Sequence, residues 1–343
     1  MRINGRAGRA LAAAAALLVL VGCGGGGGSN GSPNPGSGGS ASTDGYVLFA
    51  TDIVGGFITA FRTADPPAGQ LLAGHVVEHS DGGATIAYDA VHDDLYAVHA
   101  YASQEDVIID VFAHASQMSD DAAPSRSILV TGYVVPFATA IAFDAARNEL
   151  WLGGLTGNGG NNGGRLTVFA NASSLSGAAA PTRDIQGLPD FSTFAVDTTH
   201  DMLYLAGGGG VMHGVYAFAN ASALTSSTAA TTSRAIEGVD GVSTYLITVD
   251  DQRDVLYVPS PSGGLGIVHG ASTATPTVTT LRFAPDASCC TTAAIDSKND
   301  RLFVGAYANA YVLDSASKAT AATVTPAAAV TSPGASIFSF AFP

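Results

Sequence analysis

Lysine is almost missing from this sequence of 343 residues, occurring only at Lys298 and Lys318. Lysine and arginine together number 14, against 28 acidic residues, so the formal net charge is −14. A protein that binds nucleic acid needs a basic face to neutralise phosphates. The sequence offers no such face, so we exclude nucleic acid as a partner.

Charge of either sign is scarce. Charged residues make up 12% of the chain, whereas glycine contributes 42 residues. Low charge with abundant Gly, Thr, Val and Ala favours strands and tight turns over helices, so we expect an all-β protein. The sequence also lacks H-E-x-x-H, and its one match to G-x-S-x-G, residues 27–31, lies in a glycine-rich segment without the strand and helix that this hydrolase signature needs.

The first 22 residues have the layout of a secretory signal peptide. Three arginines precede the apolar run 10–22, which is too short to span a bilayer comfortably. The run ends in Leu20-Val21-Gly22-Cys23, which resembles the lipobox of bacterial lipoproteins. The resemblance implies that Cys23 is acylated and anchors an exported protein at the bacterial cell envelope, on its periplasmic or cell-surface side. The alternative is ordinary secretion with an incidental cysteine.

Residues 23–45 are rich in glycine and serine and contain almost no apolar residue. We expect this segment to be a flexible tether, because it cannot bury a core. Removing the signal peptide takes away three arginines and no acid, which lowers the net charge from −14 to −17. An anionic membrane surface would repel such a domain, so membrane contact should come through the acylated Cys23.

Residues 46–343 contain an eleven-residue pattern five times, as in "AVDTTHDMLYL" at 195–205. Its consensus is D-x3-[DN]-x-L-[YWF], and successive copies lie 55, 53, 53 and 46 residues apart. The first Asp ends a strand, and its carboxylate can accept hydrogen bonds from backbone N–H groups of the turn. The second Asp or Asn tolerates the left-handed backbone conformation that reverses the chain. The Leu and the aromatic residue then begin the next strand and place an apolar side chain on each of its faces. A fixed period of this size with strand-like content indicates a propeller. The first Asp residues are Asp89, Asp144, Asp197, Asp250 and Asp296.

Four strand-like segments per repeat predict a six-bladed β-propeller with four-stranded blades. The N-terminal repeat lacks a first strand, and "SIFSFAFP" at 336–343 resembles a first strand without a blade. The C-terminal strand should therefore join the N-terminal blade and close the ring, which removes two exposed edges. The expected blades are 46–79 with 336–342, 84–131, 138–187, 193–238, 244–283 and 291–330.

Segments such as "DVLYVPSPSGGLGIV" and "DRLFVGAYANAYVLD" resemble repeats of the NHL and YVTN type, and "FANASSLSGAAAPTRDI" resembles repeats of bacterial lipoprotein propellers. The resemblance covers 46–343 and implies the fold, which serves unrelated activities. We expect a lipid-anchored module that binds a protein or small-molecule ligand at the channel mouth. The alternative is a metal-dependent hydrolase similar to the gluconolactonase-like propellers, which hold a divalent cation in the channel.

Four of the five joins between blades carry an aspartate, and we expect these joins to lie on one channel mouth. Converging carboxylates could bind Ca²⁺ or a cationic partner, since hard cations prefer oxygen ligands. The alternative is that they are ordinary turn residues. This candidate rim consists of Asp81, Asp190, Asp240 and Asp286.

Cys289 and Cys290 are adjacent in the join before the last blade. Export favours oxidation, so a vicinal disulfide is one possibility, although adjacent residues are closer than disulfide geometry prefers. The other possibility is a pair of buried thiols that pack as small apolar groups.

Overall fold

The computed structural model divides the chain into two compact units, Met1–Ala41 and Ser42–Pro343. All described residues belong to the second unit. The signal peptide, Cys23 and the tether therefore lie outside them. Among the described residues, no helix is long and apolar enough to cross a membrane. The structure describes residues 46–341 apart from 53–56, 64–72, 79–84, 100–105, 120–121, 132–139, 156–162, 208–213, 227–232, 240–245, 261–263, 284–289, 291, 307–308, 321–322, 325–327 and 332–336.

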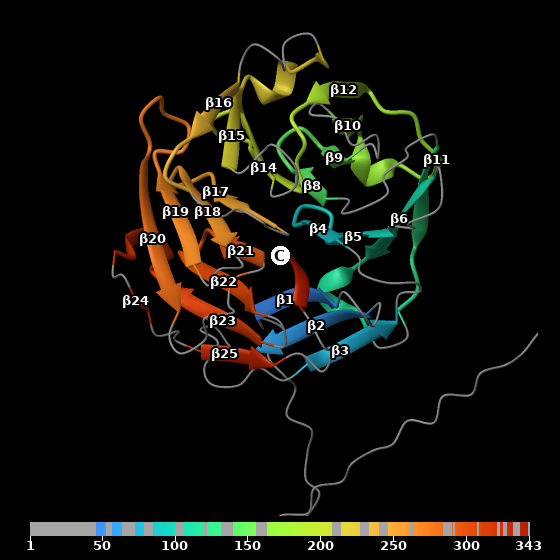
Figure 1. The fold of residues 1–343 in the computed structure, drawn as a ribbon. Coiled ribbons are helices and arrows are strands. Elements are labelled where there is room, and N and C mark those ends of the chain that lie inside the picture. Colours follow the sequence, from blue (N-terminus) through green and yellow to red (C-terminus); the bar gives the residue numbers. More distant parts are fainter. Residues whose placement is uncertain are drawn as a thin grey trace, which may run out of the picture. The chain divides into compact units, whose positions relative to one another are not determined.

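The second unit consists of small sheets that follow one another along the chain (Figure 1). The described strands form six sheets, and in each the neighbouring long strands run antiparallel. In hydrogen-bonded order the first three sheets are β26 (Ile337–Ala341), β1 (Tyr46–Asp52), β2 (Phe57–Thr63), β3 (Ala73–Glu78); β4 (Thr85–Asp89), β5 (Asp94–His99), β6 (Val107–Ala113), β7 (Arg126–Val130), β11 (Gly177–Ala178); and β8 (Ala140–Asp144), β9 (Glu149–Leu155), β10 (Gly164–Ala170), β12 (Arg183–Leu188). The other three are β13 (Thr193–Asp197), β14 (Met202–Gly207), β15 (Gly214–Ala219), β16 (Ser233–Ile236); β17 (Thr248–Asp250), β18 (Val255–Ser260), β19 (Gly264–His269), β20 (Thr277–Phe283), β24 (Thr323–Val324); and β21 (Thr292–Asp296), β22 (Arg301–Ala306), β23 (Asn309–Asp314), β25 (Ala328–Thr331).

An all-β fold of the propeller type is confirmed, but the expectation of four strands per sheet is wrong in two sheets. The two-residue strand β11 pairs in parallel with β7, and β24 pairs in parallel with β20. Both additions come from the connection inside the following repeat. They satisfy backbone groups that the outer strands β7 and β20 would otherwise leave unpaired at a sheet edge.

The last described strand, β26, lies beside the first described strand, β1 (Figure 1, red beside blue). The two strands are antiparallel, with Phe49 opposite Ala341 and Ala50 opposite Phe340. β26 also contacts β4 and β21, the first strands of two other sheets. The first strand of the N-terminal sheet is thus supplied by the end of the chain.

The apolar core lies between successive sheets. In β9, Leu150 packs into the cluster shared with the preceding sheet, whereas Trp151 packs into the cluster shared with the following one. Leu203 and Tyr204 of β14 divide in the same way. All four side chains are fully buried. The Leu-aromatic pair of the motif therefore joins each sheet to both neighbours, as its alternation predicts.

The turn inside each motif follows the expected chemistry. Oδ1 of Asp144 accepts the N–H of Arg147 at 3.0 Å, and Oδ1 of Asp197 accepts the N–H of His200 at 2.8 Å. The second acidic or amide residue has positive φ in every copy, for example 54° at Asp201. Short polar side chains tolerate that conformation better than other residues do. The motif aspartates are therefore primarily turn residues.

A recurring Ala-Ser pair completes the turn. The N–H and Oγ of Ser222 each donate to the carboxylate of Asp201 at 2.8 Å, and Ser272 makes the same two bonds to Asp254. In the one repeat with asparagine, Ser173 N–H donates to Oδ1 of Asn148, whose amide donates to Ser173 Oγ. The end of the third strand is thereby fixed to the first hairpin of its own sheet.

Candidate functional site

The first strands of five sheets line a cavity of about 390 Å³. These strands are β4, β8, β13, β17 and β21, and neighbouring members contact one another. This arrangement makes the cavity the described part of a central channel between the sheets. The channel is a candidate site for ligand binding because it is concave and lined by five repeats.

Most residues of the channel wall have apolar side chains, although polar atoms make up the larger part of the surface exposed to the cavity. Its aromatic rings are those of Tyr88, Phe143 and Phe194. Tyr88 and Phe143 precede the first motif aspartate and are half-buried, because the neighbouring sheet covers only part of each ring. The aliphatic lining includes Ile86, Ile141, Val196, Leu246, Ile247, Val249 and Ile295.

Polar groups gather where the first strands end. Thr198, Asp251 and Ser297 each directly follow a motif aspartate and line the cavity. The hydroxyl groups of Thr198 and Thr199 donate to Oδ2 of Asp251, at 3.0 and 3.2 Å. Asp251 is the single charged side chain among the described lining residues. This polar mouth lies at the motif turns, whereas the predicted acidic rim belongs to the joins between blades.

Of the four aspartates predicted to form an acidic rim, one lies among the described residues. Asp190 is half-buried, and its Oδ1 accepts the N–H of Gly163 at 2.7 Å. The bond joins the connection between β12 and β13 to the residue before β10, so this carboxylate holds two segments together and does not cap its own turn. The other three rim candidates, Asp81, Asp240 and Asp286, lie outside the described residues. Convergence of the rim and its use by Ca²⁺ stay predictions.

The cysteine pair is also described only in part. Cys290 is buried in the cluster between the β17 and β21 sheets, and its N–H donates to the carbonyl of Gly305 at 3.2 Å. Its φ of 85° is unusual for a residue with a side chain. Cys289 lies outside the described residues, and the vicinal disulfide stays a prediction.

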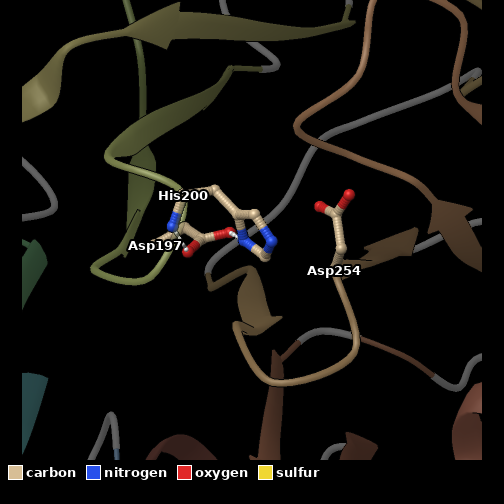
Figure 2. A group of neighbouring side chains, drawn as sticks. All are labelled: Asp197, His200 and Asp254. Carbon is tan, nitrogen blue, oxygen red and sulfur yellow. Dashed lines mark hydrogen bonds and ion pairs between the residues drawn. The ribbon is translucent and has the colours of Figure 1, made fainter.

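Figure 2 shows a second cluster, in which the imidazole of His200 lies between the carboxylates of Asp197 and Asp254. Asp254 belongs to the repeat after that of His200. His200 Nδ1 lies 2.9 Å from Oδ2 of Asp197. One potential ligand atom from each of the three residues lies within 4.8 Å of the others. The cluster therefore has the composition of a metal site.

Neighbouring repeats give this cluster a simpler explanation. Arg147 occupies the position of His200 and pairs with Asp144 of its own repeat at 2.7 Å and Asp201 of the next at 3.3 Å. Arg253 pairs with Asp250 at 2.8 Å and approaches Asp300 at 4.0 Å. A guanidinium thus fills the same space in two repeats. We therefore interpret the His200 cluster as an inter-repeat ion pair with histidine in place of arginine.

The charge of His200 depends on these carboxylates. Partial burial disfavours the imidazolium, but the hydrogen bond to Asp197 and the charges of Asp197, Asp254 and Asp251 outweigh burial and raise the pKa of His200. Burial also raises the pKa of Asp197, despite its bonds to His200. Burial, together with the charges of Asp197 and Asp254, raises the pKa of the Tyr204 hydroxyl group. The interface between the β13 and β17 sheets is therefore electronegative.

A second inter-repeat contact involves the arginine of the fourth strand. Arg183 lies over the Trp151 ring at 4.7 Å, pairs with Glu149 at 2.8 Å and donates to the carbonyl of Ala221 in the next repeat at 2.8 Å. Arg126 likewise donates to the carbonyl of Leu175. The S-R and T-R pairs that recur at 125–126, 182–183 and 233–234 are the signal of this contact in the sequence.

No family model and no curated protein matches this chain. Among solved structures, hydrazine synthase from Kuenenia stuttgartiensis is similar, with a TM-score of 0.50 and 15% sequence identity. The likeness covers 80% of this chain and 74% of that one. At this identity it shows the fold alone, since propellers serve unrelated activities. The comparison therefore supports a β-propeller, and the NHL and YVTN character of the repeats remains a resemblance.

Proposed function

We propose that this protein is a binding module of the bacterial cell envelope, a six-bladed propeller closed by β26 and anchored through an acylated Cys23. Its channel takes a small ligand with an apolar body. The six described sheets and the contacts of β26 with β1, β4 and β21 support the ring. The signal peptide and lipobox-like segment support export and anchoring.

The observation that carries the binding function is the composition of the channel. Its volume of about 390 Å³ falls in the range of small-molecule sites, and its wall combines aromatic and aliphatic side chains with a larger exposed polar surface. Removing an apolar ligand from water into such a site is favourable in proportion to the apolar area buried. Five repeats contribute residues to the wall.

The lactonase-like alternative requires several acidic and amide ligands that converge on one cation. The described channel wall supplies a single carboxylate, that of Asp251. In the cluster around His200, both oxygens of Asp197 accept from His200 and both oxygens of Asp254 accept from Ser272. The described residues therefore favour the binding module over the hydrolase.

Binding of 4-phenyl-1-butanol, measured by calorimetry, tests the proposal. The probe is uncharged and has an aromatic body that the channel can accommodate. The exported chain with Cys23→Ser is used, so that no detergent micelle competes for the probe. We expect saturable binding with one site per chain.

A blocking variant locates the site. Ala145 is exposed at the channel mouth, so Ala145→Trp should obstruct entry without disturbing the core. Ala180→Trp places the same bulk on an exposed position outside the channel lining and serves as the control. Loss of binding in the first variant alone is expected. No binding to the parent chain, or equal binding to both variants, would contradict the proposal.

A further inference from the structure

The polar mouth of the channel is anionic. Asp251 follows the last residue of β17 and lines the cavity, and its described polar contacts are the hydroxyl groups of Thr198 and Thr199. A hydroxyl group that donates to a carboxylate leaves its negative charge in place. Ser297 lines the same mouth and supplies a further hydroxyl group. A ligand that enters here therefore meets one negative charge and several hydrogen-bonding oxygens.

The surrounding aspartates are neutralised unequally. Asp144 and Asp250 each lie within 2.8 Å of an arginine that is always charged. In the sector of Asp251, the cation at the equivalent position is His200, a much weaker base than arginine. Asp197 and Asp254 share this one imidazole, and Asp251 adds a third carboxylate nearby. Three carboxylates therefore act on one weak base at His200. The next cation, Arg253, is paired with Asp250 and donates to the carbonyl of Ser297.

The wall below this mouth carries apolar side chains that an apolar body can contact. These are aliphatic side chains and the rings of Tyr88, Phe143 and Phe194. A carboxylate or phosphate on the ligand would be repelled by Asp251. Charge complementarity at the mouth thus selects the sign of the ligand's polar group.

We propose that the channel binds a primary amine with an apolar body, the ammonium group lying between Asp251, Thr198 and Ser297 and the body lying against the first strands. This inference rests on the proposed binding function and specifies its ligand class. The ammonium group would replace water at Asp251 with a charge-assisted hydrogen bond, which is stronger than one between neutral groups. The body would supply most of the affinity and the ammonium group most of the selectivity.

Three probes of nearly equal shape test the ligand class: 4-phenylbutylamine, 4-phenyl-1-butanol and 4-phenylbutyrate. Dissociation constants are measured by calorimetry at pH 7 and low ionic strength. We expect the amine to bind about tenfold more tightly than the alcohol, and the carboxylate to bind most weakly. The preference for the amine should shrink as salt is added, because the mouth is open to solvent.

Asp251→Asn keeps the shape of the site and removes its charge, so it should abolish the preference for the amine and leave the affinity for the alcohol within about twofold. Asp184→Asn is the matched control. It changes the net charge by the same amount at an exposed carboxylate paired with Arg165, outside the channel. The control should retain the preference.

The outcomes separate this inference from the proposed function. Equal affinity for amine and alcohol, or a preference that survives Asp251→Asn, would overturn the ligand class and leave the binding module intact. Failure of all three probes to bind the parent chain would overturn both. Amine selectivity that disappears in Asp251→Asn and persists in Asp184→Asn supports both.

Discussion

The guanidinium of Arg147 lies 3.3 Å from the carboxylate of Asp201, which belongs to the following repeat. The contact shows how neighbouring sheets are joined at the motif turns, where the apolar core ends. The same position is occupied by His200 opposite Asp254 and by Arg253 opposite Asp300. One position in the motif thus determines whether an interface is held by a permanent charge or by one that depends on pH.

Loss of the Arg183 side chain should destabilise the domain more than loss of a surface arginine. Arg183→Ala removes the contact with the buried ring of Trp151, leaves Glu149 unpaired and frees the carbonyl of Ala221. We expect a loss of about 3 kcal/mol in the free energy of unfolding, measured by urea denaturation. Arg165→Ala, whose partner Asp184 lies in the same sheet and near solvent, should cost at most about 1 kcal/mol. Equal losses of unfolding free energy in the two variants would show that the contact between repeats stabilises the domain no more than a surface ion pair does.

His200 should make stability depend on pH near neutrality. Its pKa is raised in the folded state, so the folded protein holds the proton more tightly than the unfolded chain does. The stabilisation is complete below the ordinary pKa of histidine, about 6.5, and is lost as pH rises through the folded value. We therefore expect His200→Gln to reduce the difference in melting temperature between pH 6 and pH 8.

Asp254→Asn removes the negative charge of residue 254 and keeps its hydrogen bonds to Ser272, so it tests the effect of the charge alone. Asn148 shows that asparagine fits the equivalent position and keeps both bonds to the following serine. The variant should fold normally and flatten the pH dependence, because the imidazolium loses one of its carboxylates. A pH dependence unchanged in both His200→Gln and Asp254→Asn would assign the titration to another group.

Deletion of residues 334–343 should lower the melting temperature by more than about 5 °C. The deletion removes β26, whose backbone pairs with β1 and which contacts β4 and β21. It would therefore expose strand edges in the N-terminal sheet. Deletion of 342–343 alone leaves β26 whole and is the control. If the longer deletion melts like the control, β26 does not support the domain.

Cys23→Ser should move the protein from the membrane fraction to the soluble fraction without lowering its melting temperature. The substitution removes the acylation site, and the tether separates that site from the domain. Cys289→Ser should leave the distribution unchanged, because it retains Cys23. Fractionation followed by immunoblotting measures both. A Cys23→Ser chain that still sediments with membranes would contradict lipid anchoring.

The sequence alone determined the propeller, because its local patterns repeat. Leu150 and Trp151 alternate on a strand, so both faces had to be covered by other sheets, and the buried positions of these residues confirm this. The left-handed turn at Asp201 was predictable from side-chain chemistry and spacing within one repeat. Such features depend on residues that are near neighbours in the chain.

Only the tertiary structure brought Asp251 to the channel wall beside Thr198 and placed His200 opposite Asp254. Each pair joins two repeats about fifty residues apart, and no local pattern sets which side chain of one turn meets which of the next. The parallel strand β11 on β7 has the same origin, since it satisfies the edge of a neighbouring sheet. These relationships depend on how the sheets stack, and stacking is decided by the apolar surface that all the repeats bury together.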